Sequence, residues 1–126
     1  MKPSRLLAAA LTLAAIGGQS AQAMDVRFTG KTRASGKLMA DLLSTITGYT
    51  KQRYQCSFIF SIDSAMQPAG YEPRNPAYRV ASVQRSYERW VVNACGKKRA
   101  FFVAFGNNPR GGADYKAQEI PNGVMP

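Results

Sequence analysis

The chain has 126 residues, of which 17 are Lys or Arg, 7 are Asp or Glu and none is His, so its formal net charge at pH 7 is +10. This length allows one domain with one modest core, not two. Because histidine is absent, a Ser-His-Asp triad and a metal site with imidazole ligands are both excluded.

The first 23 residues have the three parts of a secretory signal peptide. Lys2 and Arg5 provide a positive start, Leu6 to Ile16 is a largely apolar run, and Ala21-Gln22-Ala23 is an A-x-A cleavage pattern. The apolar run is too short for a membrane span, which needs about 20 apolar residues. We therefore predict a cleaved signal, a mature chain of residues 24–126 without a transmembrane anchor, and a periplasmic or secreted location.

The two cysteines, Cys56 and Cys95, both fall in the predicted mature part. An even number of cysteines in an oxidising compartment favours a disulfide. A reactive thiol would need a base or a C-x-x-C motif, and the sequence has neither a histidine nor that motif. We predict that Cys56 and Cys95 form a disulfide, which closes a loop of about 40 residues and stabilises the domain by about 4 kcal/mol.

The first half of the mature chain has the pattern of a strand, a helix and a second strand. Asp25 to Thr29 alternates as a strand does, and Ser35 is placed to cap a helix that Gly48 would end, with the β-prone residues 44–47 favouring an early end. Tyr54 to Ser61 reads as a strand with one inward face. The helical apolar positions are Leu38, Met39, Leu42, Leu43 and Ile46, and the inward strand positions are Tyr54, Cys56, Phe58 and Phe60.

The second half has a proline-rich loop followed by alternating strands. We predict a loop at Gln67 to Pro76, an edge strand at Tyr78 to Gln84, and the clearest strands at Ser86 to Ala94 and Arg99 to Phe105. Trp90, Val92 and Ala94 share one face, as do Phe101, Val103 and Phe105. The remaining predicted segments are a tight hairpin at Cys95 to Lys98, a turn at Gly106 to Gly112, a last strand at Ala113 to Ile120 and a loose tail at residues 121–126.

These elements predict a single small α+β domain over residues 24–126. An N-terminal helix packs on a small antiparallel sheet, and one disulfide links the sheet segments. A β-sandwich with an incidental helix is the alternative architecture.

The segment from Ser86 to Ala117 resembles a C-terminal pattern in small uncharacterised envelope proteins of Gram-negative bacteria. That pattern reads Trp-x-Val-x-x-Cys-Gly, a strand, Gly-Gly and a further strand; here it is carried by Trp90, Val92, Cys95, Gly96 and Gly111-Gly112. The resemblance implies a periplasmic module and carries no catalytic residues. Many such proteins are lipoproteins, and this chain departs from them because it has no cysteine to acylate near the cleavage site.

Sequence motifs point to no catalytic residue, no metal and no cofactor. Gly-x-Ser-x-Gly and calcium-loop patterns are absent, and residues 106–112 lack the order of a phosphate-binding loop. Residues 98–105 match the RNA-recognition pattern only at scattered positions. Export would also separate the protein from cellular RNA, so we predict no intracellular nucleic-acid partner.

The positive charge is the main functional signal. Cleavage would remove Lys2 and Arg5 and leave a net charge of about +8. Lys97, Lys98 and Arg99 cluster at the predicted hairpin, and Arg110 lies in the next turn, which we place at an adjacent end of the sheet. We predict that these four residues make a non-catalytic binding module for an anionic envelope component or an acidic protein partner.

The sequence is also compatible with two other functions. A protein-directed inhibitor or immunity factor would use the proline-rich loop, with Tyr71 and Tyr78 as anchors, because aromatic residues dominate interface energetics. A hydrolase would need two of the seven carboxylates to meet across a cleft. The spacing of the carboxylates in the sequence does not test that arrangement.

Overall fold

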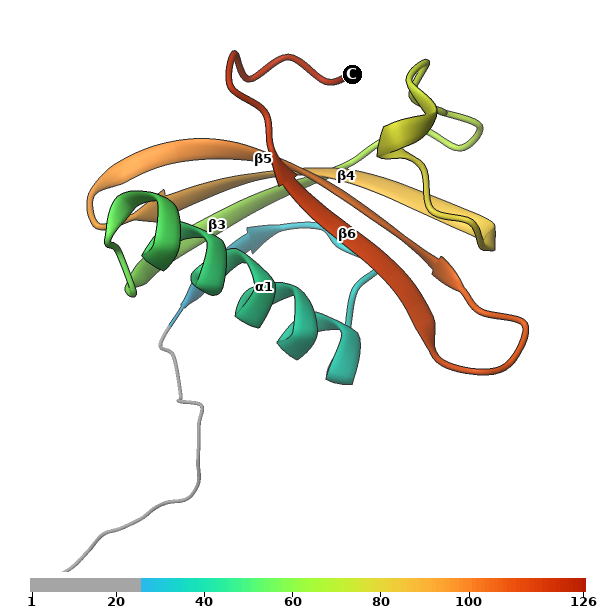
Figure 1. Cartoon of the computed structure of the whole chain (residues 1–126), viewed down its shortest axis with the longest axis horizontal. Helices are drawn as coiled ribbons and strands as arrows, with labels where there is room; N and C mark the ends of the chain where they lie inside the picture. Colours follow the sequence, from blue (N-terminus) through green and yellow to red (C-terminus); the bar gives the residue numbers. More distant parts are fainter. Residues whose placement is uncertain (1–25) are drawn as a thin grey trace, which may run out of the picture.

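The computed structural model describes residues 26–126, so the predicted signal peptide lies outside the described part of the chain. Residues 26–126 form one α-helix and a five-stranded sheet with the strand order β2-β3-β4-β5-β6 (Figure 1). The elements are β2 (Arg27–Gly30), α1 (Gly36–Tyr54), β3 (Ile59–Met66), the short 3-10 helix η3 (Pro76–Tyr78), β4 (Val83–Ala94), β5 (Lys97–Asn107) and β6 (Ala113–Glu119). The α+β class is confirmed. The described residues form a single sheet, not the two sheets of a sandwich.

The sheet is mixed, which corrects the prediction of an antiparallel sheet behind a helix. β2 and β3 are parallel, and the other three neighbouring pairs are antiparallel. Parallel neighbours need a crossover connection, and α1 supplies it between β2 and β3. β2 ends at Gly30, where φ is +83° and a Cβ atom would lie 2.0 Å from the Ser64 carbonyl oxygen, so only glycine fits there.

Helix α1 is longer than predicted, because Gly48 lies inside it and the helix continues to Tyr54. Leu42, Ile46 and Thr50 are fully buried at four-residue intervals, so the buried stripe runs through the β-prone segment and beyond it. Burial of this stripe against the sheet outweighs the weak local preference for an earlier end.

The strand predicted at Tyr54 to Ser61 is wrong in both position and face. Tyr54 ends the helix, and β3 begins at Ile59 with a bulge between Ile59 and Ser61. Phe58 and Phe60, predicted to point inward, are 50% and 49% exposed. The buried residues of this segment are Cys56, as predicted, together with Ile59 and Ile62. The aromatic alternation therefore marked a solvent-facing pair, because register and not hydrophobicity alone decides which face is buried.

The main core lies between α1 and the sheet, and the β4 and β5 positions predicted to share a face are confirmed there. Trp90 and Val92 from β4 and Phe101 and Val103 from β5 are buried in one cluster with Leu42 and Ile46 of the helix. The tight hairpin is also confirmed: β4 ends at Ala94 and β5 begins at Lys97. Cys95 and Gly96 between them have φ values of 52° and 87°, as a tight two-residue turn requires.

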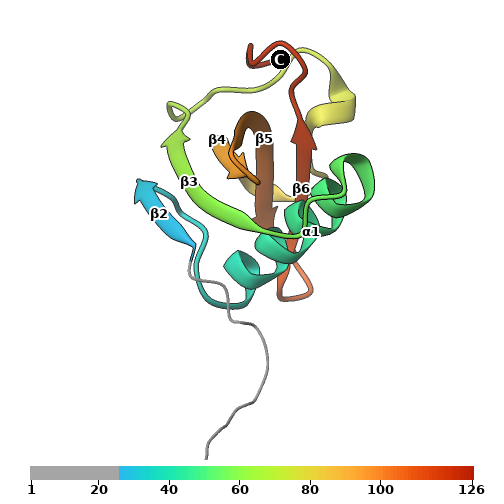
Figure 2. The ribbon, with the colours of Figure 1, turned by 90° about the vertical axis from the view of Figure 1, so that its left-hand side faces the viewer.

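A second cluster lies on the sheet face away from α1, which we call the outer face. It contains Phe102, Ala104 and Tyr87, and it is covered by the 67–82 segment and the C-terminal tail (Figure 2).

The edge strand predicted at Tyr78 to Gln84 is wrong, because η3 ends at Tyr78 and β4 begins only at Val83. The tail predicted to be loose also makes contacts, since Arg89 Nε donates to the Gly123 carbonyl at 3.2 Å. Both segments cover apolar sheet residues that water would otherwise reach.

Candidate functional site

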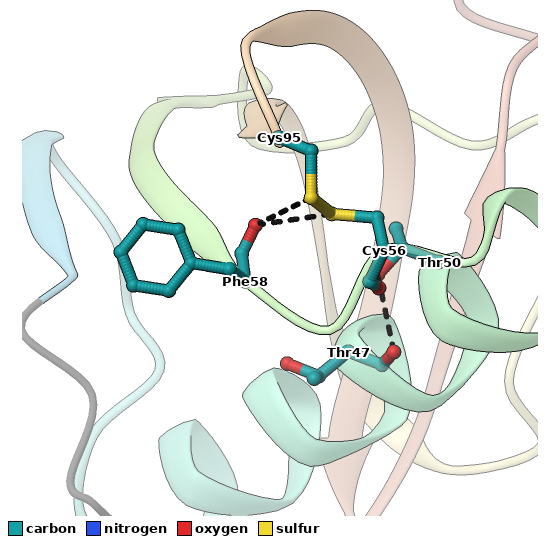
Figure 3. Close-up of a disulfide and its surroundings, with 5 residues drawn as sticks. All are labelled: Thr47, Thr50, Cys56, Phe58 and Cys95. Atoms are coloured by element: carbon teal, nitrogen blue, oxygen red, sulfur yellow. Dashed lines mark hydrogen bonds between the residues drawn. A yellow bond between two sulfur atoms is a disulfide. The ribbon is translucent and has the colours of Figure 1, made fainter.

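The disulfide between Cys56 and Cys95 is confirmed, with Cα atoms 6.0 Å apart (Figure 3). The Phe58 carbonyl oxygen accepts a hydrogen bond from the Cys95 backbone N–H at 3.1 Å and lies 3.1 Å from Cys56 Sγ. The Thr50 hydroxyl donates to the Cys56 carbonyl at 3.0 Å. The cross-link therefore holds the C-terminal end of α1 against the β4–β5 hairpin, immediately before Lys97 and Lys98.

Lys97, Lys98 and Arg99 lie together, as the sequence predicted, at the start of β5. With Arg89 and Glu119 they line an open groove of about 470 Å³ beside the C-terminal tail, which we call the tail groove. Lys97 and Lys98 are exposed and form no ion pair with any residue of the described chain. Sequence reasoning missed Arg89, although its alternation with the buried Trp90 already places it on the outer face.

Arg99, predicted as a contact residue for a partner, is engaged within the protein. Its Nη1 lies 3.5 Å from Glu119 Oε2, and its guanidinium carbon lies 3.3 Å from the centre of the Tyr54 ring. Its side chain is only 19% exposed. Arg99 therefore joins β5 to α1 and β6, and the cations that remain free in the tail groove are those of Lys97 and Lys98 together with the partly engaged Arg89.

Glu119 is the carboxylate at the centre of this contact. The Tyr49 hydroxyl donates to Glu119 Oε1 at 2.7 Å, and the Tyr54 hydroxyl donates to the same oxygen. Burial alone would raise the pKa of Glu119, but the two tyrosine hydrogen bonds and the Arg99 charge outweigh burial and lower the pKa below its usual 4.5. Glu119 is therefore ionised at neutral pH, and Arg99 and the two tyrosines already satisfy its charge.

Tyr49 is expected to ionise at a higher pH than an ordinary tyrosine. Burial, followed by its hydrogen bond to the Glu119 carboxylate, raises the pKa of Tyr49 from 10.0 to about 12. A raised pKa contributes stability that is complete below about pH 10 and is lost as the pH rises toward 12. The difference in tyrosinate absorbance between the wild-type protein and Tyr49→Phe should therefore titrate near pH 12. A difference curve centred near pH 10 would contradict both the desolvation of Tyr49 and its hydrogen bond to Glu119.

Arg110 does not lie near the other three predicted basic contact residues, which corrects the prediction of adjacent hairpin ends. Lys97 begins β5, and Arg110 lies in the turn after β5 ends at Asn107. The two turns are at opposite ends of the strand (Figure 1), roughly 33 Å apart at about 3.3 Å per residue. β5 is antiparallel to both β4 and β6, so the turn before β5 and the turn after it lie at opposite ends of the strand.

Tyr71 and Tyr78, the predicted anchors for a protein partner, pack inside the outer-face cluster. The Tyr71 ring lies 5.7 Å from the Tyr87 ring, and the Tyr78 ring lies 5.3 Å from the Phe102 ring. The Tyr71 hydroxyl also donates to the carbonyl of Pro126. Both rings are half-buried and help to cover the sheet, so the proline-rich segment serves as part of the fold.

The six carboxylates of residues 26–126 each have a separate set of partners. The most buried is Glu88, which is fully inaccessible and which sequence reasoning did not single out. It accepts hydrogen bonds from the Thr32 hydroxyl at 2.7 Å, the Arg33 backbone N–H at 2.8 Å and Trp90 Nε1 at 2.8 Å. Glu88 therefore holds the connection between β2 and α1 against β4. A sequence signal was available, because Glu88 has the same strand parity as the inward-facing Trp90.

No protein-family model, curated protein or solved structure matches the chain. The part of the chain that the structure describes contains no cluster of three or more Cys, Asp or Glu side chains arranged to hold a metal ion. Within residues 26–126, no helix is long and apolar enough to cross a membrane.

Proposed function

We propose that the protein is a non-catalytic periplasmic or secreted module that binds an anionic component of the cell envelope. The observation that carries the proposal is the tail groove, which four basic side chains, those of Arg89, Lys97, Lys98 and Arg99, line together with a single carboxylate, Glu119. Because Glu119 is already paired with Arg99, the groove keeps a surplus of positive charge. The predicted signal peptide and the disulfide support a location in an oxidising compartment.

The physical basis is attraction between these cations and phosphate or carboxylate groups. An exposed charge acts over about 8 Å at physiological ionic strength, so two neighbouring free lysines reinforce each other. Each Lys or Arg near an anionic surface contributes about 1 kcal/mol. The same positive charge would also attract an acidic protein.

Replacing Lys97 and Lys98 with alanine should weaken binding to phosphatidylglycerol vesicles about thirtyfold, because two surface cations together contribute about 2 kcal/mol. The measurement is vesicle co-sedimentation at several salt concentrations. Wild-type binding should also weaken steeply as salt rises, because screening shortens the reach of the charges. Arg99 is kept in this variant, since its removal would also take away the guanidinium that Glu119 and Tyr54 both contact.

The matched control is Lys31→Ala combined with Arg110→Ala. Both side chains are exposed, neither lines the tail groove, and the variant has the same net charge as the test variant. Its binding should stay within about threefold of wild type, a loss of well under the 2 kcal/mol expected from the groove. Equal losses in both variants would mean that overall charge and not the groove attracts vesicles, and salt-independent binding would contradict the proposal.

A further inference from the structure

One row of polar side chains crosses four strands on the part of the outer face that the tail and the 67–82 segment leave open. Arg27 of β2 pairs with Ser61 of β3, Ser61 pairs with Asn93 of β4, and Asn93 pairs with Lys98 of β5. These four residues, the polar row, line an open groove of about 360 Å³ together with Thr29, Asp63 and Val91. The Cα atoms of Arg27 and Lys98 are separated by three strand spacings, roughly 14 Å.

The side-chain amide of Asn93, in the middle of the row, has an oxygen that accepts no hydrogen bond within residues 26–126. Its Oδ1 is buried and has no partner among the described residues. Buried polar atoms in folded proteins nearly always have a partner. The Asn93 side chain also lines the groove, so a rotation of its amide would bring Oδ1 within reach of a donor on a bound ligand. Arg27 and Lys98 on either side are exposed, and neither forms an ion pair within residues 26–126.

Aromatic rings border the same row. Phe60 lines a neighbouring groove of about 470 Å³ with Arg27, Ser61 and Asn93, so it flanks the polar row. Phe58 packs edge-on against Phe60, with the two ring centres 4.5 Å apart, and both residues are about half exposed. A rigid exposed ring offers a flat apolar surface at low entropic cost. The apolar C–H face of a sugar ring can stack on such a surface.

We propose that the polar row binds an acidic oligosaccharide. Sugar hydroxyls donate and accept, so they can satisfy Asn93 Oδ1, while acidic groups at the two ends of the ligand meet Arg27 and Lys98. Asp63 in the same groove accepts a hydrogen bond from the Thr29 hydroxyl at 3.0 Å, and with Arg27 and Lys98 beside it the groove keeps a net positive charge that attracts acidic sugars. This inference rests on the proposed function for the ligand's charge, and it adds the chemical class of the ligand.

The test compares tetragalacturonate, the neutral maltotetraose, an acidic tetraglutamate peptide and phosphatidylglycerol vesicles as probes of the full mature protein. Isothermal titration calorimetry should show tetragalacturonate binding that Asn93→Ala weakens about tenfold, since a buried hydrogen bond to the ligand is lost. Binding to the vesicles should remain unchanged in Asn93→Ala. Gln52→Ala, an exposed amide on α1, is the matched control and should bind like wild type. Maltotetraose should bind more weakly than tetragalacturonate, because it lacks the acidic groups.

Arg27→Ala provides a second variant in case Asn93→Ala does not fold, because the Arg27 side chain is exposed. It should weaken tetragalacturonate binding about tenfold, the loss of one charge-assisted contact. Vesicle binding without tetragalacturonate binding would overturn this inference and leave the proposed function standing. Binding of neither probe would overturn both, and tetragalacturonate binding unaffected by both variants would place the saccharide elsewhere. Binding of an acidic peptide with the same dependence on Asn93, without tetragalacturonate binding, would replace the saccharide with a protein ligand.

Discussion

Replacing Cys56 and Cys95 together with alanine is expected to lower the free energy of unfolding by about 4 kcal/mol. The bond joins residues 39 positions apart, so its loss frees a long loop in the unfolded chain. A domain of this size has only about 5–15 kcal/mol of stability in total, so the variant should be close to unfolding. Urea unfolding of the wild-type and double-variant proteins measures the difference.

The position of the disulfide also predicts which part of the fold its removal should destabilise most. The disulfide holds the end of α1 against the β4–β5 hairpin, so hydrogen exchange should accelerate most at the C-terminal turn of α1 and in the hairpin. Unfolding of the wild-type protein with and without a reductant is the control. If reduction changes the free energy of unfolding by less than about 1 kcal/mol, the disulfide does not constrain the fold as described.

Glu88→Ala should cost about 3 kcal/mol of stability or more. Its carboxylate accepts from the Thr32 hydroxyl, the Arg33 backbone N–H and the Trp90 indole, and all three donors would lose their acceptor. An unsatisfied buried donor costs about 1–3 kcal/mol, so several together make a large effect. The measurement is denaturant unfolding, together with Trp90 fluorescence as a report on the local environment.

Two other variants sharpen the Glu88 experiment. Glu88→Gln keeps one carbonyl oxygen as an acceptor and should retain part of the stability. Glu72→Ala removes an exposed carboxylate that binds Arg85 and Tyr87, and it should cost about 1 kcal/mol or less. Equal losses for Glu88→Ala and Glu72→Ala would show that the buried carboxylate does not hold the connection between β2 and α1.

Several elements were predictable because local patterns and burial agree. The faces of β4 and β5 follow from the alternation around Trp90 and Phe101, since a strand places every second side chain on one side. The Cys95-Gly96 turn followed from local turn chemistry, and the disulfide from the number of cysteines and the compartment predicted for them. The lengths of α1 and β3 were not predictable in this way. Their ends depend on which residues meet the sheet, and helical and strand patterns overlap between Thr50 and Phe60.

The candidate sites divide in the same way. Lys97 and Lys98 are neighbours in the chain, so their cluster was visible in the sequence. Arg110 was misplaced because the whole length of β5 lies between the turn before Lys97 and the turn that contains Arg110. The polar row joins residues from four strands, and no local pattern aligns Arg27, Ser61 and Asn93 across neighbouring strands.

By itself, the sequence determined the α+β class, the cysteine pairing and the inward faces of the two long strands. These properties arise from composition and from contacts between residues close along the chain. The parallel pairing of β2, the internal role of Arg99, the cover over the outer face, the tail groove and the polar row were decided only by the tertiary structure. Strand register and the burial of distant surfaces against one another produce them, and both depend on long-range packing that short-range periodicity does not encode.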